Sequence, residues 1–576
     1  MSLLPFGTLP AYTPRRWVPP ATALGDWAAV APLFDRLEER LTHCATAPAL
    51  EAWLGDWGEL GAALDEESSR RYIAMTCHTE DAAAERAYLE FVEQIEPRVK
   101  PRQFALEQRY LAHPARPNLP PARYEVFHRQ TQTHVALFRE ANVPLETEDT
   151  KLGQQYQKLS GSLTVRFREE EHTLVQMARY LEEPDRPLRQ QAWELTVNRR
   201  LREAAKFEDF FTRMLGLRER IAAQAGFPNY MEYAFRARFR FDYTPADCRA
   251  FHQAVEILVL PLRRQLQATR RQRLGLTTLR PWDLAVDPLN QPPLRPFATV
   301  EELVTRAQGI FDQVDGGLGR GFTLMREQRL LDLENRKGKA PGGYQCTLAE
   351  ARLPFIFMNA VGLQRDVETV LHEAGHAFHT LASQNEPFYP YRSAPIEFCE
   401  VASMSMELLG NQFLEAFYPA PEAKRARREH LEGIIDILPW IATIDAFQHW
   451  VYTHPGHAPA EREAAWLELM DRFGGDVDWR GYEAARANLW HRQLHLFLHP
   501  FYYIEYGIAQ LGALQVWANA KRDRARAVAD YQRALALGGA RPLPELFRAA
   551  GCRFDFTHAT LEPLVALVQD ELKTLA

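Results

Sequence analysis

The stretch Val370-Leu-His-Glu-Ala-Gly-His-Ala-Phe-His379 decides how the rest of this chain is interpreted. It places His372 and His376 four residues apart, with Glu373 directly after the first histidine. On an α-helix, residues at i and i+4 share a face, so both imidazoles can point at one ion. The H-E-x-x-H pattern is typical of zinc peptidases, in which the ion makes water acidic and the glutamate takes its proton. We therefore expect a metal-binding helix here.

A catalytic zinc ion needs a third protein ligand, with one position left for water. In the longer metzincin pattern a histidine would fall at Ala382, so that arrangement fails. Residues 395–409 have helical composition, and their carboxylates Glu397, Glu400 and Glu407 are spaced to share one face. The flanking residues are mostly apolar, so these carboxylates need a cation partner. The third ligand is expected among the three.

A small β-sheet is predicted directly before the metal helix. Residues 330–347 combine a strand-like start with a Gly-rich turn, and residues 353–359 have the apolar composition of a strand. We expect two short strands joined near Gly342 and Gly343. An exposed edge of this sheet can pair with an extended peptide. An ordinary hairpin that uses glycine for its turn geometry is the alternative.

Most of the remaining chain is predicted to be helical. Apolar residues recur at helical spacing between residues 26 and 139, with breaks at proline. Further helices are expected at 185–224, 245–273 and 300–313. Residues 163–174 alternate between apolar and polar, which predicts a β-hairpin. The Pro-rich span 275–300 carries large apolar residues and predicts an ordered loop.

Composition places the chain among ordinary globular proteins: 576 residues, 46% hydrophobic and 25% charged. This length favours two lobes or one large multi-helix body. The net charge of -7 gives no footprint for nucleic acid. The six cysteines contain no C-x-x-C pair, so neither a disulfide framework nor a thiolate zinc site is indicated. Without a signal-like or membrane-spanning apolar run, we expect a cytoplasmic protein with no membrane partner.

Four blocks carry a further resemblance: His372-Glu-Ala-Gly-His-Ala-Phe-His379, Phe398-Cys-Glu-Val-Ala-Ser403, Gly338-Lys-Ala-Pro-Gly-Gly-Tyr344 and Gln493-Leu-His-Leu-Phe-Leu-His-Pro-Phe-Tyr-Tyr-Ile-Glu-Tyr-Gly507. With them the chain resembles the thimet oligopeptidase and oligoendopeptidase F family of zinc metallopeptidases. The fourth block is closest to the bacterial oligoendopeptidase F or Pz-peptidase branch. Weaker similarity extends back to about Asn229.

The resemblance implies roles for residues of the metal helix and of the helix that follows it. Its ligands for one Zn²⁺ per chain correspond to His372, His376 and Glu400. Glu373 corresponds to the general base. Glu368 and Glu407 correspond to carboxylates that orient a ligand histidine. We expect His379 to support the helix and not to bind metal.

The fourth block supplies hydrogen-bond donors. Attack of water on a peptide carbonyl creates an oxyanion, which phenol or imidazole donors stabilise by roughly 3 kcal/mol each. By resemblance, His495, Tyr503 and Tyr506 act on the substrate or its transition state, and Tyr502 assists in binding. The strand residues expected to bind the substrate are Gly342, Gly343 and Tyr344.

The fold implied by the resemblance is mainly α: a large multi-helix body of two lobes around a deep substrate channel, with a small β-sheet beside the metal helix. We expect an N-terminal helical lobe over 1–190 and the catalytic region over 191–576. A deep channel excludes folded proteins. The expected function is therefore zinc-dependent endopeptidase hydrolysis of short, unstructured peptides by metal-activated water.

Two alternatives remain open. A zinc carboxypeptidase of the same chemistry would hold a peptide terminus with an arginine, for which Arg336, Arg352 and Arg392 are candidates. A non-catalytic peptide-binding protein would keep the helical shell, but the presence of ligands, base and donors together weakens this possibility. Neither the oligomeric state nor the cleavage preference is determined by the sequence.

Overall fold

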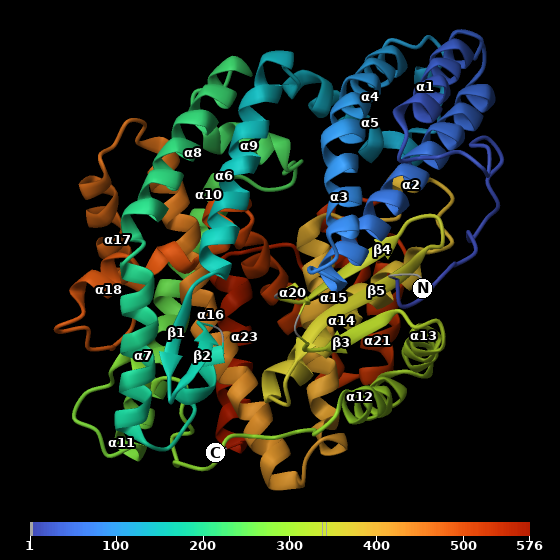
Figure 1. Ribbon diagram of the computed structural model, residues 1–576. Helices are drawn as coiled ribbons and strands as arrows, with labels where there is room; N and C mark the ends of the chain where they lie inside the picture. Colours follow the sequence, from blue (N-terminus) through green and yellow to red (C-terminus); the bar gives the residue numbers. More distant parts are fainter. Residues whose placement is uncertain (1–3, 175, 337, 341, 576) are drawn as a thin grey trace. The chain divides into compact units, whose positions relative to one another are not determined.

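The computed structural model describes residues 4–174, 176–336, 338–340 and 342–575 and confirms the mainly α fold, with 69% helix and small sheets. The chain forms two compact units, each built from three separated segments. Unit 1 comprises residues 1–136, 295–423 and 512–554, and unit 2 comprises 137–294, 424–511 and 555–576. Figure 1 gives the order of the elements along the chain. A domain boundary near residue 190 stays a prediction.

Unit 1 holds the predicted metal helix. Its helices and strands are α1 (Trp27–Thr42), α2 (Ala47–Cys77), α3 (Ala82–Glu90), α4 (Glu96–Leu111), α12 (Val300–Val314), α13 (Gly316–Glu327), β3 (Leu331–Glu334), β4 (Tyr344–Leu348), β5 (Leu353–Ala360), α14 (Gln364–Ser383), α15 (Ile396–Gly410), α21 (Arg524–Leu535) and α22 (Leu543–Ala549). Unit boundaries fall within three helices, which are α5 (Pro121–Leu137), α16 (Ala420–Thr453) and α20 (Tyr503–Arg522).

Unit 2 holds the predicted hairpin and the tyrosine-rich block. Besides the parts of the three shared helices, its helices and strands are α6 (Val143–Gly161), β1 (Thr164–Phe167), β2 (Glu170–Thr173), α7 (Arg186–Leu201), α8 (Ala204–Gln224), α9 (Tyr230–Ala237), α10 (Pro245–Ala254), α11 (Leu260–Arg273), α17 (Pro459–Phe473), α18 (Glu483–Ala487), α19 (Leu494–Leu498) and α23 (His558–Thr574). Among the described residues, no helix is both long and apolar enough to cross a membrane.

Two predicted features of unit 2 are confirmed. β1 and β2 pair antiparallel, and the turn between them holds Arg168 and Glu169 at positive φ, which matches the twist of a tight hairpin. In the Pro-rich loop, Trp282 is buried and Asp283 is fully buried against Arg189, with 3.0 Å between carboxylate and guanidinium. The loop is therefore ordered.

The small sheet of unit 1 has three strands in the order β3-β5-β4. The predicted small sheet is confirmed, but the predicted join of its two strands near Gly342 and Gly343 is wrong, because these glycines link β3 to β4, which lie on opposite edges. β5 pairs parallel with β3 and antiparallel with β4. Its nearly continuous apolar run suits a central strand that is covered on both faces. β4 is an edge strand, as a peptide-pairing surface requires.

Helix α13 is not predicted from the sequence, because its glycines are unusual in a helix. A Cβ placed on Gly319 would collide with Asp312 of α12, and one placed on Gly321 would lie 3.0 Å from Leu381 of α14. The glycines therefore permit close packing of α13 against both neighbours.

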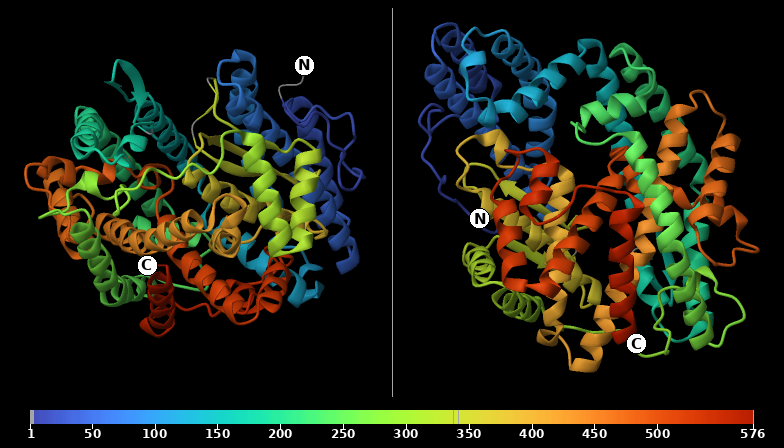
Figure 2. Two further views of the ribbon diagram at one scale, coloured as in Figure 1. Left: turned by 90° about the horizontal axis from the view of Figure 1, so that it is seen from below. Right: turned by 180° about the vertical axis from the view of Figure 1, so that it is seen from behind.

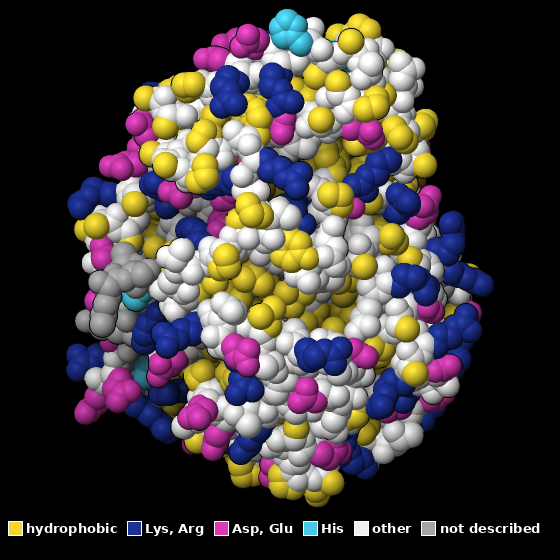
Figure 3. Space-filling model, turned by 90° about the vertical axis from the view of Figure 1, so that its right-hand side faces the viewer, with side chains coloured by type: hydrophobic (Ala, Val, Ile, Leu, Met, Phe, Trp, Pro, Cys, Tyr) yellow, Lys and Arg dark blue, Asp and Glu magenta, His cyan; other side chains and the backbone are white. Residues whose placement is uncertain are grey.

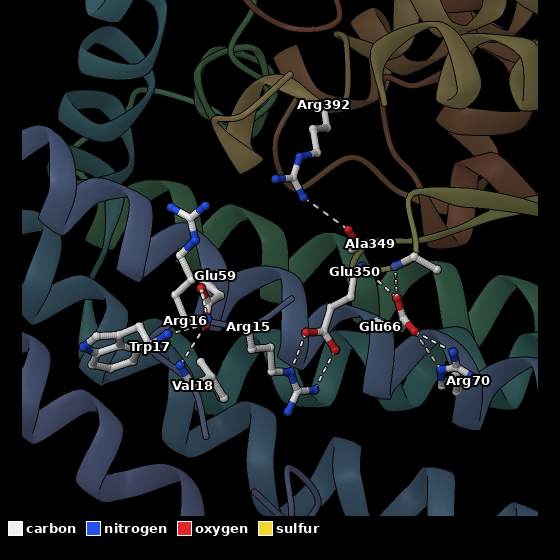
Figure 4. A network of polar contacts seen from close by, with 11 residues as sticks. Arg15, Arg16, Trp17, Val18, Glu59, Glu66, Arg70, Ala349, Glu350 and Arg392 are labelled. Atoms are coloured by element: carbon white, nitrogen blue, oxygen red, sulfur yellow. Dashed lines mark hydrogen bonds and ion pairs between the residues drawn. The ribbon is translucent and has the colours of Figure 1, made fainter. Parts of the chain in front are cut away.

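A network of carboxylates fixes the β4–β5 turn to α2 (Figure 4). Glu66, which is 5% exposed, accepts the backbone N–H groups of Glu350 at 2.7 Å and Ala351 at 2.8 Å. Arg15 forms a two-point ion pair with Glu350, with both contacts at 2.6 Å. Charge-assisted bonds of this kind give geometric precision. Because α14 packs on β4 and β5, the network also helps to place the metal helix.

The third segment of unit 1 covers the metal helices. α21 packs on α14 and α22 packs on α15, and the red helices of this segment lie beside the yellow ones in Figures 1 and 2. The fully buried Tyr531 donates its hydroxyl to the carbonyl of Ala402 at 2.8 Å. Residues far apart in sequence therefore build the surroundings of α15.

Candidate active site

The donor atoms of His372, His376 and Glu400 lie within 4.8 Å of one another. Glu400 Oε2 is 3.4 Å from His372 Nε2 and 3.7 Å from His376 Nε2. Two imidazole nitrogens and one carboxylate oxygen form the donor set of many catalytic zinc sites, so these residues fit the ion. Glu397, in the first turn of α15, is buried but is not part of this group among the described residues.

Gly375 lets α14 and α15 approach closely enough to bring these donors together. A Cβ at this position would lie 2.5 Å from Ser403 Cα and 2.6 Å from the carbonyl oxygen of Ala402. Both are backbone atoms, so no side-chain rotation can relieve the contact. The glycine within H-E-A-G-H is therefore a packing requirement of the site.

Gly375→Ala is expected to lower the free energy of unfolding by about 3 kcal/mol, because the added methyl group forces the two backbones apart. Gly309→Ala is the matched control: Gly309 also lies inside a helix of unit 1, but nothing lies within 4 Å of its added Cβ. There alanine should stabilise by up to about 1 kcal/mol. Urea unfolding measures both variants, and equal effects would contradict the packing argument.

Polar neighbours orient two members of the donor group. Glu407 Oε1 lies 2.6 Å from His372 Nδ1, so Nδ1 carries the hydrogen and Nε2 faces Glu400. Ser403 donates its hydroxyl to Glu400 Oε2 at 3.0 Å. Glu368, one turn before His372, accepts the side-chain amide of Gln364 at 3.3 Å.

Charge coupling keeps the Glu400 carboxyl ionised. Burial raises the pKa of Glu400, but the nearby His376 and the hydrogen bond from His372 outweigh it and hold the pKa at about 2. Burial is the main cause that lowers the pKa of His376 to about 4. Burial also opposes charge on His372, but Glu400 and Glu407 hold its pKa well above the usual value. An ionised carboxylate therefore faces the two imidazoles.

Glu373 lies beside the donor group and is 8% exposed. Burial raises the pKa of its carboxyl to about 7. Gly343, directly before β4, is its neighbour, since a Cβ there would lie 3.8 Å from Glu373 Oε1. Gly342 has φ +99, which favours glycine. The Gly-rich block therefore reaches the predicted base.

Two other predicted residues of unit 1 are held by packing. Tyr344 stacks on Phe357 with ring centroids 4.8 Å apart, and its hydroxyl lies 2.6 Å from Thr76 Oγ1. His379 is 5% exposed and lies edge-on to Phe398. Burial lowers the pKa of His379 to about 3, so its ring is neutral.

The histidine and tyrosines of the fourth block form a cluster in unit 2. His495 Nε2 lies 3.3 Å from the hydroxyl of Tyr506, and Gln493 Nε2 lies 2.8 Å from His495 Nδ1. The rings of Tyr502 and Tyr503 also contact His495, at 5.5 and 5.1 Å between centroids. Tyr503 is buried and burial raises its pKa to about 12, whereas Tyr502 and Tyr506 are partly exposed.

A strained turn sets the position of this cluster. Phe501, between α19 and α20, has φ +64 and is fully buried. Its N–H donates to Gln448 Oε1 at 2.5 Å. A non-glycine residue held in this backbone region is unusual and is found preferentially at functional sites.

The three arginines of the carboxypeptidase alternative all have protein partners. Arg336 pairs with Asp332 at 2.6 Å. Arg352 donates to the carbonyl of Gln384 at 2.5 Å, and Arg392 donates to the carbonyl of Ala349 at 3.2 Å.

On the face drawn in Figure 3, Lys and Arg side chains lie among Asp and Glu side chains. The surface shown is therefore mixed in charge.

Residues 179–565 match the family model described as peptidase family M3, and residues 23–138 match the peptidase M3 N-terminal domain. An oligoendopeptidase F homolog of Lactococcus lactis subsp. lactis (strain IL1403) is 25% identical over 266 residues, 43% of this chain and 41% of the relative. Oligopeptidase PepF of Bacillus subtilis (strain 168) is 30% identical over 128 residues, 22% of this chain and 19% of that protein. These matches span less than half of either curated relative.

Solved structures match over nearly the whole chain. Pz peptidase A with inhibitor 2 gives a TM-score of 0.90 at 26% identity, covering 97% of this chain and 99% of that one. A protein described as an oligoendopeptidase F gives the same TM-score and coverage at 28% identity.

Proposed function

Because the chain belongs to peptidase family M3, we propose that it is a zinc-dependent endopeptidase that hydrolyses short, unstructured peptides. The resemblance noted in the sequence is thereby confirmed. The observation that carries the proposal is the convergence of His372, His376 and Glu400 beside the buried Glu373. When bound, zinc supplies Lewis acidity, which polarises a carbonyl and lowers the pKa of water.

In this proposal Glu373 moves the proton. Its carboxylate accepts a proton from the attacking water and returns it to the leaving amine. In the metal-free chain, burial raises the pKa of this carboxyl to about 7, which favours its holding the proton between the two transfers. Glu407 holds the hydrogen on His372 Nδ1 and so leaves Nε2 free for the ion.

The edge strand β4 supplies the proposed binding surface for the peptide backbone. Among the described residues, β5 is the one strand that pairs with β4, so an extended peptide can add to the other edge of β4 as a further strand. Gly342 leaves room for the peptide, since nothing lies within 4 Å of an added Cβ, and Gly343 brings the start of this strand close to Glu373. Tyr344 is held by Thr76 and Phe357, and it contributes a rigid backbone position.

By the family resemblance, we propose that the His495 cluster supplies donors to the oxyanion. Tyr506 and His495 are the better donors, since Tyr506 is partly exposed and touches the imidazole. Tyr502 assists in binding. Tyr503 is buried, and its main contribution is to hold the cluster.

Tyr506→Phe is expected to lower kcat roughly 10²- to 10³-fold with little change in KM, because it removes a hydroxyl that acts mainly in the transition state. Steady-state kinetics on a quenched fluorescent peptide measures the effect. Tyr482→Phe is the control, since its hydroxyl bonds Glu194 in another cluster of unit 2. An increase in KM with kcat unchanged would assign Tyr506 to ground-state binding.

Digestion of a mixed peptide library, read by mass spectrometry, tests the function as a whole. We expect cuts at internal bonds of short peptides, loss of cutting with a chelator, and recovery with added Zn²⁺. Stepwise release of C-terminal residues would favour the carboxypeptidase alternative. The partnered state of Arg336, Arg352 and Arg392 speaks against that outcome. Chelator-resistant cutting would contradict the zinc mechanism.

A further inference from the structure

We propose that unit 2 carries a second zinc site, made by Cys248, Asp445 and His449 and separate from the peptidase site. The sulfur, carboxylate oxygen and imidazole nitrogen of these residues lie within 4.8 Å of one another. Cys248 and Asp445 are 0% exposed, and His449 is 9% exposed. The cysteine spacing predicts no thiolate zinc site, because the donors come from distant helices and not from a C-x-x-C pair.

The donors come from one face of each of two helices. Asp445 and His449 are four residues apart on α16, and Cys248 and His252 are four residues apart at α10. At this spacing two side chains of a helix point in the same direction. His252 Nε2 lies 2.8 Å from Asp445 Oδ2, and this contact joins the two faces.

Among the described residues, two buried polar atoms of the cluster have no hydrogen-bond partner of good geometry. Asp445 Oδ1 is buried with no hydrogen-bond partner among the described residues. His449 Nε2 is also buried and lies 3.2 Å from Asp445 Oδ2 without an aligned hydrogen bond. Buried polar atoms are normally satisfied, and an exception calls for a missing ligand. A cation bound to Asp445 and His449 would satisfy both atoms.

The chemistry of the donors selects the ion. A thiolate, an imidazole and a carboxylate are all zinc ligands, whereas Mg²⁺ and Ca²⁺ require oxygen donors. The carboxylate and the thiolate together balance the charge of Zn²⁺. Burial raises the pKa of the Cys248 thiol well above its usual value, so the free thiol is neutral and releases its proton when the ion binds. His252 holds Asp445 in place, as the outer partners of zinc ligands do.

A cavity of about 330 Å³ gives a path to the cluster. Both His252 and His449 line it, together with Glu468 and the two cations Arg249 and Arg472. Arg472 is neutralised by Glu256, with 2.9 Å between its Nε and the carboxylate. The histidine side of the cluster is therefore open to a small ion, while Cys248 is closed to larger reagents.

The ion would cross-link α10 and α16 within unit 2. Such a cross-link stabilises the folded state by an amount that rises with the logarithm of the free metal concentration above the dissociation constant. This site contains a thiolate and the peptidase site does not. A spectroscopic signal of metal–sulfur bonding therefore reports on it alone.

The test uses the full-length His376→Ala variant, which weakens the peptidase site and leaves unit 2 unchanged. It is stripped with a chelator, dialysed and titrated with Co²⁺. We expect about one equivalent of Co²⁺ to bind, with a near-ultraviolet thiolate-to-cobalt charge-transfer band, and Zn²⁺ to displace it. Added Zn²⁺ should also raise the thermal midpoint of this variant. If the His376→Ala variant shows no such band, the proposal is overturned, and His449 and Asp445 form a pair without metal.

Cys248→Ser in the otherwise unchanged chain supplies the matched control. It should keep Co²⁺ at the peptidase site and lose the charge-transfer band. A band that persists in this variant assigns the signal to another cysteine and overturns the site. If the serine variant does not fold, the His376→Ala titration decides alone. Loss of peptidase activity in any arm concerns the proposed function and not this site.

Discussion

Glu373→Gln is expected to retain its zinc ion and to lose turnover by about 10²- to 10⁴-fold, the usual contribution of a positioned general base. Glutamine has the size and shape of glutamate, so the buried position beside Gly343 should tolerate it. Its amide oxygen cannot accept a proton at neutral pH. Since Glu373 is not one of the three donors, zinc content should not change.

Two measurements on the same preparation check this result: kcat on a fluorogenic peptide and zinc content by mass spectrometry. Glu334→Gln is a suitable control, because it makes the same charge change at an exposed position of unit 1. It should match the unmodified chain in both measurements. Turnover that survives in Glu373→Gln would remove this residue from the base role.

Glu400→Gln is expected to lower the affinity for zinc more than 100-fold. Loss of a residue that only hydrogen-bonds a metal ligand costs roughly 10- to 100-fold, and loss of a ligand should cost more. Activity should fall in parallel with zinc binding. The neutral amide is a poorer ligand than a carboxylate, and the charge that faces both imidazoles disappears. Glu397→Gln is the matched comparison. It lies one turn earlier on α15 and is also buried, but it lies outside the donor group.

Competition with a zinc chelator of known affinity separates these two variants. Glu397→Gln should bind zinc as the unmodified chain does. The assignment of the third ligand is reversed if Glu397→Gln loses the ion and Glu400→Gln keeps it. Spacing alone makes the three carboxylates of α15 equal candidates for the third ligand. This comparison therefore tests the choice of Glu400, which rests on the family resemblance.

Local patterns predicted the parts of the site that lie within one helix. The spacing of His372, Glu373 and His376 is a property of α14 itself, and the structure has a helix there. Choosing Glu400 needed the resemblance, because helical spacing does not say which carboxylate faces a second helix. The role of Gly375 was hidden, since it depends on the backbone of α15.

Features that depend on distant contacts escaped prediction. The order of the sheet was wrong because β5 pairs with strands on both sides, and one of them precedes the Gly-rich segment. Helix α13 was not predicted, because its glycines are explained only by its close packing against α12 and α14. The cluster of Cys248, Asp445 and His449 joins helices almost two hundred residues apart, so no spacing rule could find it.

The three-segment construction of unit 1 has a consequence for synthesis on the ribosome. The metal helices emerge before residue 423, but α21 and Tyr531, which cover them, belong to residues 512–554. At translation speeds of about 5–20 residues per second, this gap lasts on the order of ten seconds. A nascent chain therefore lacks the finished surroundings of its ligands until translation is nearly complete.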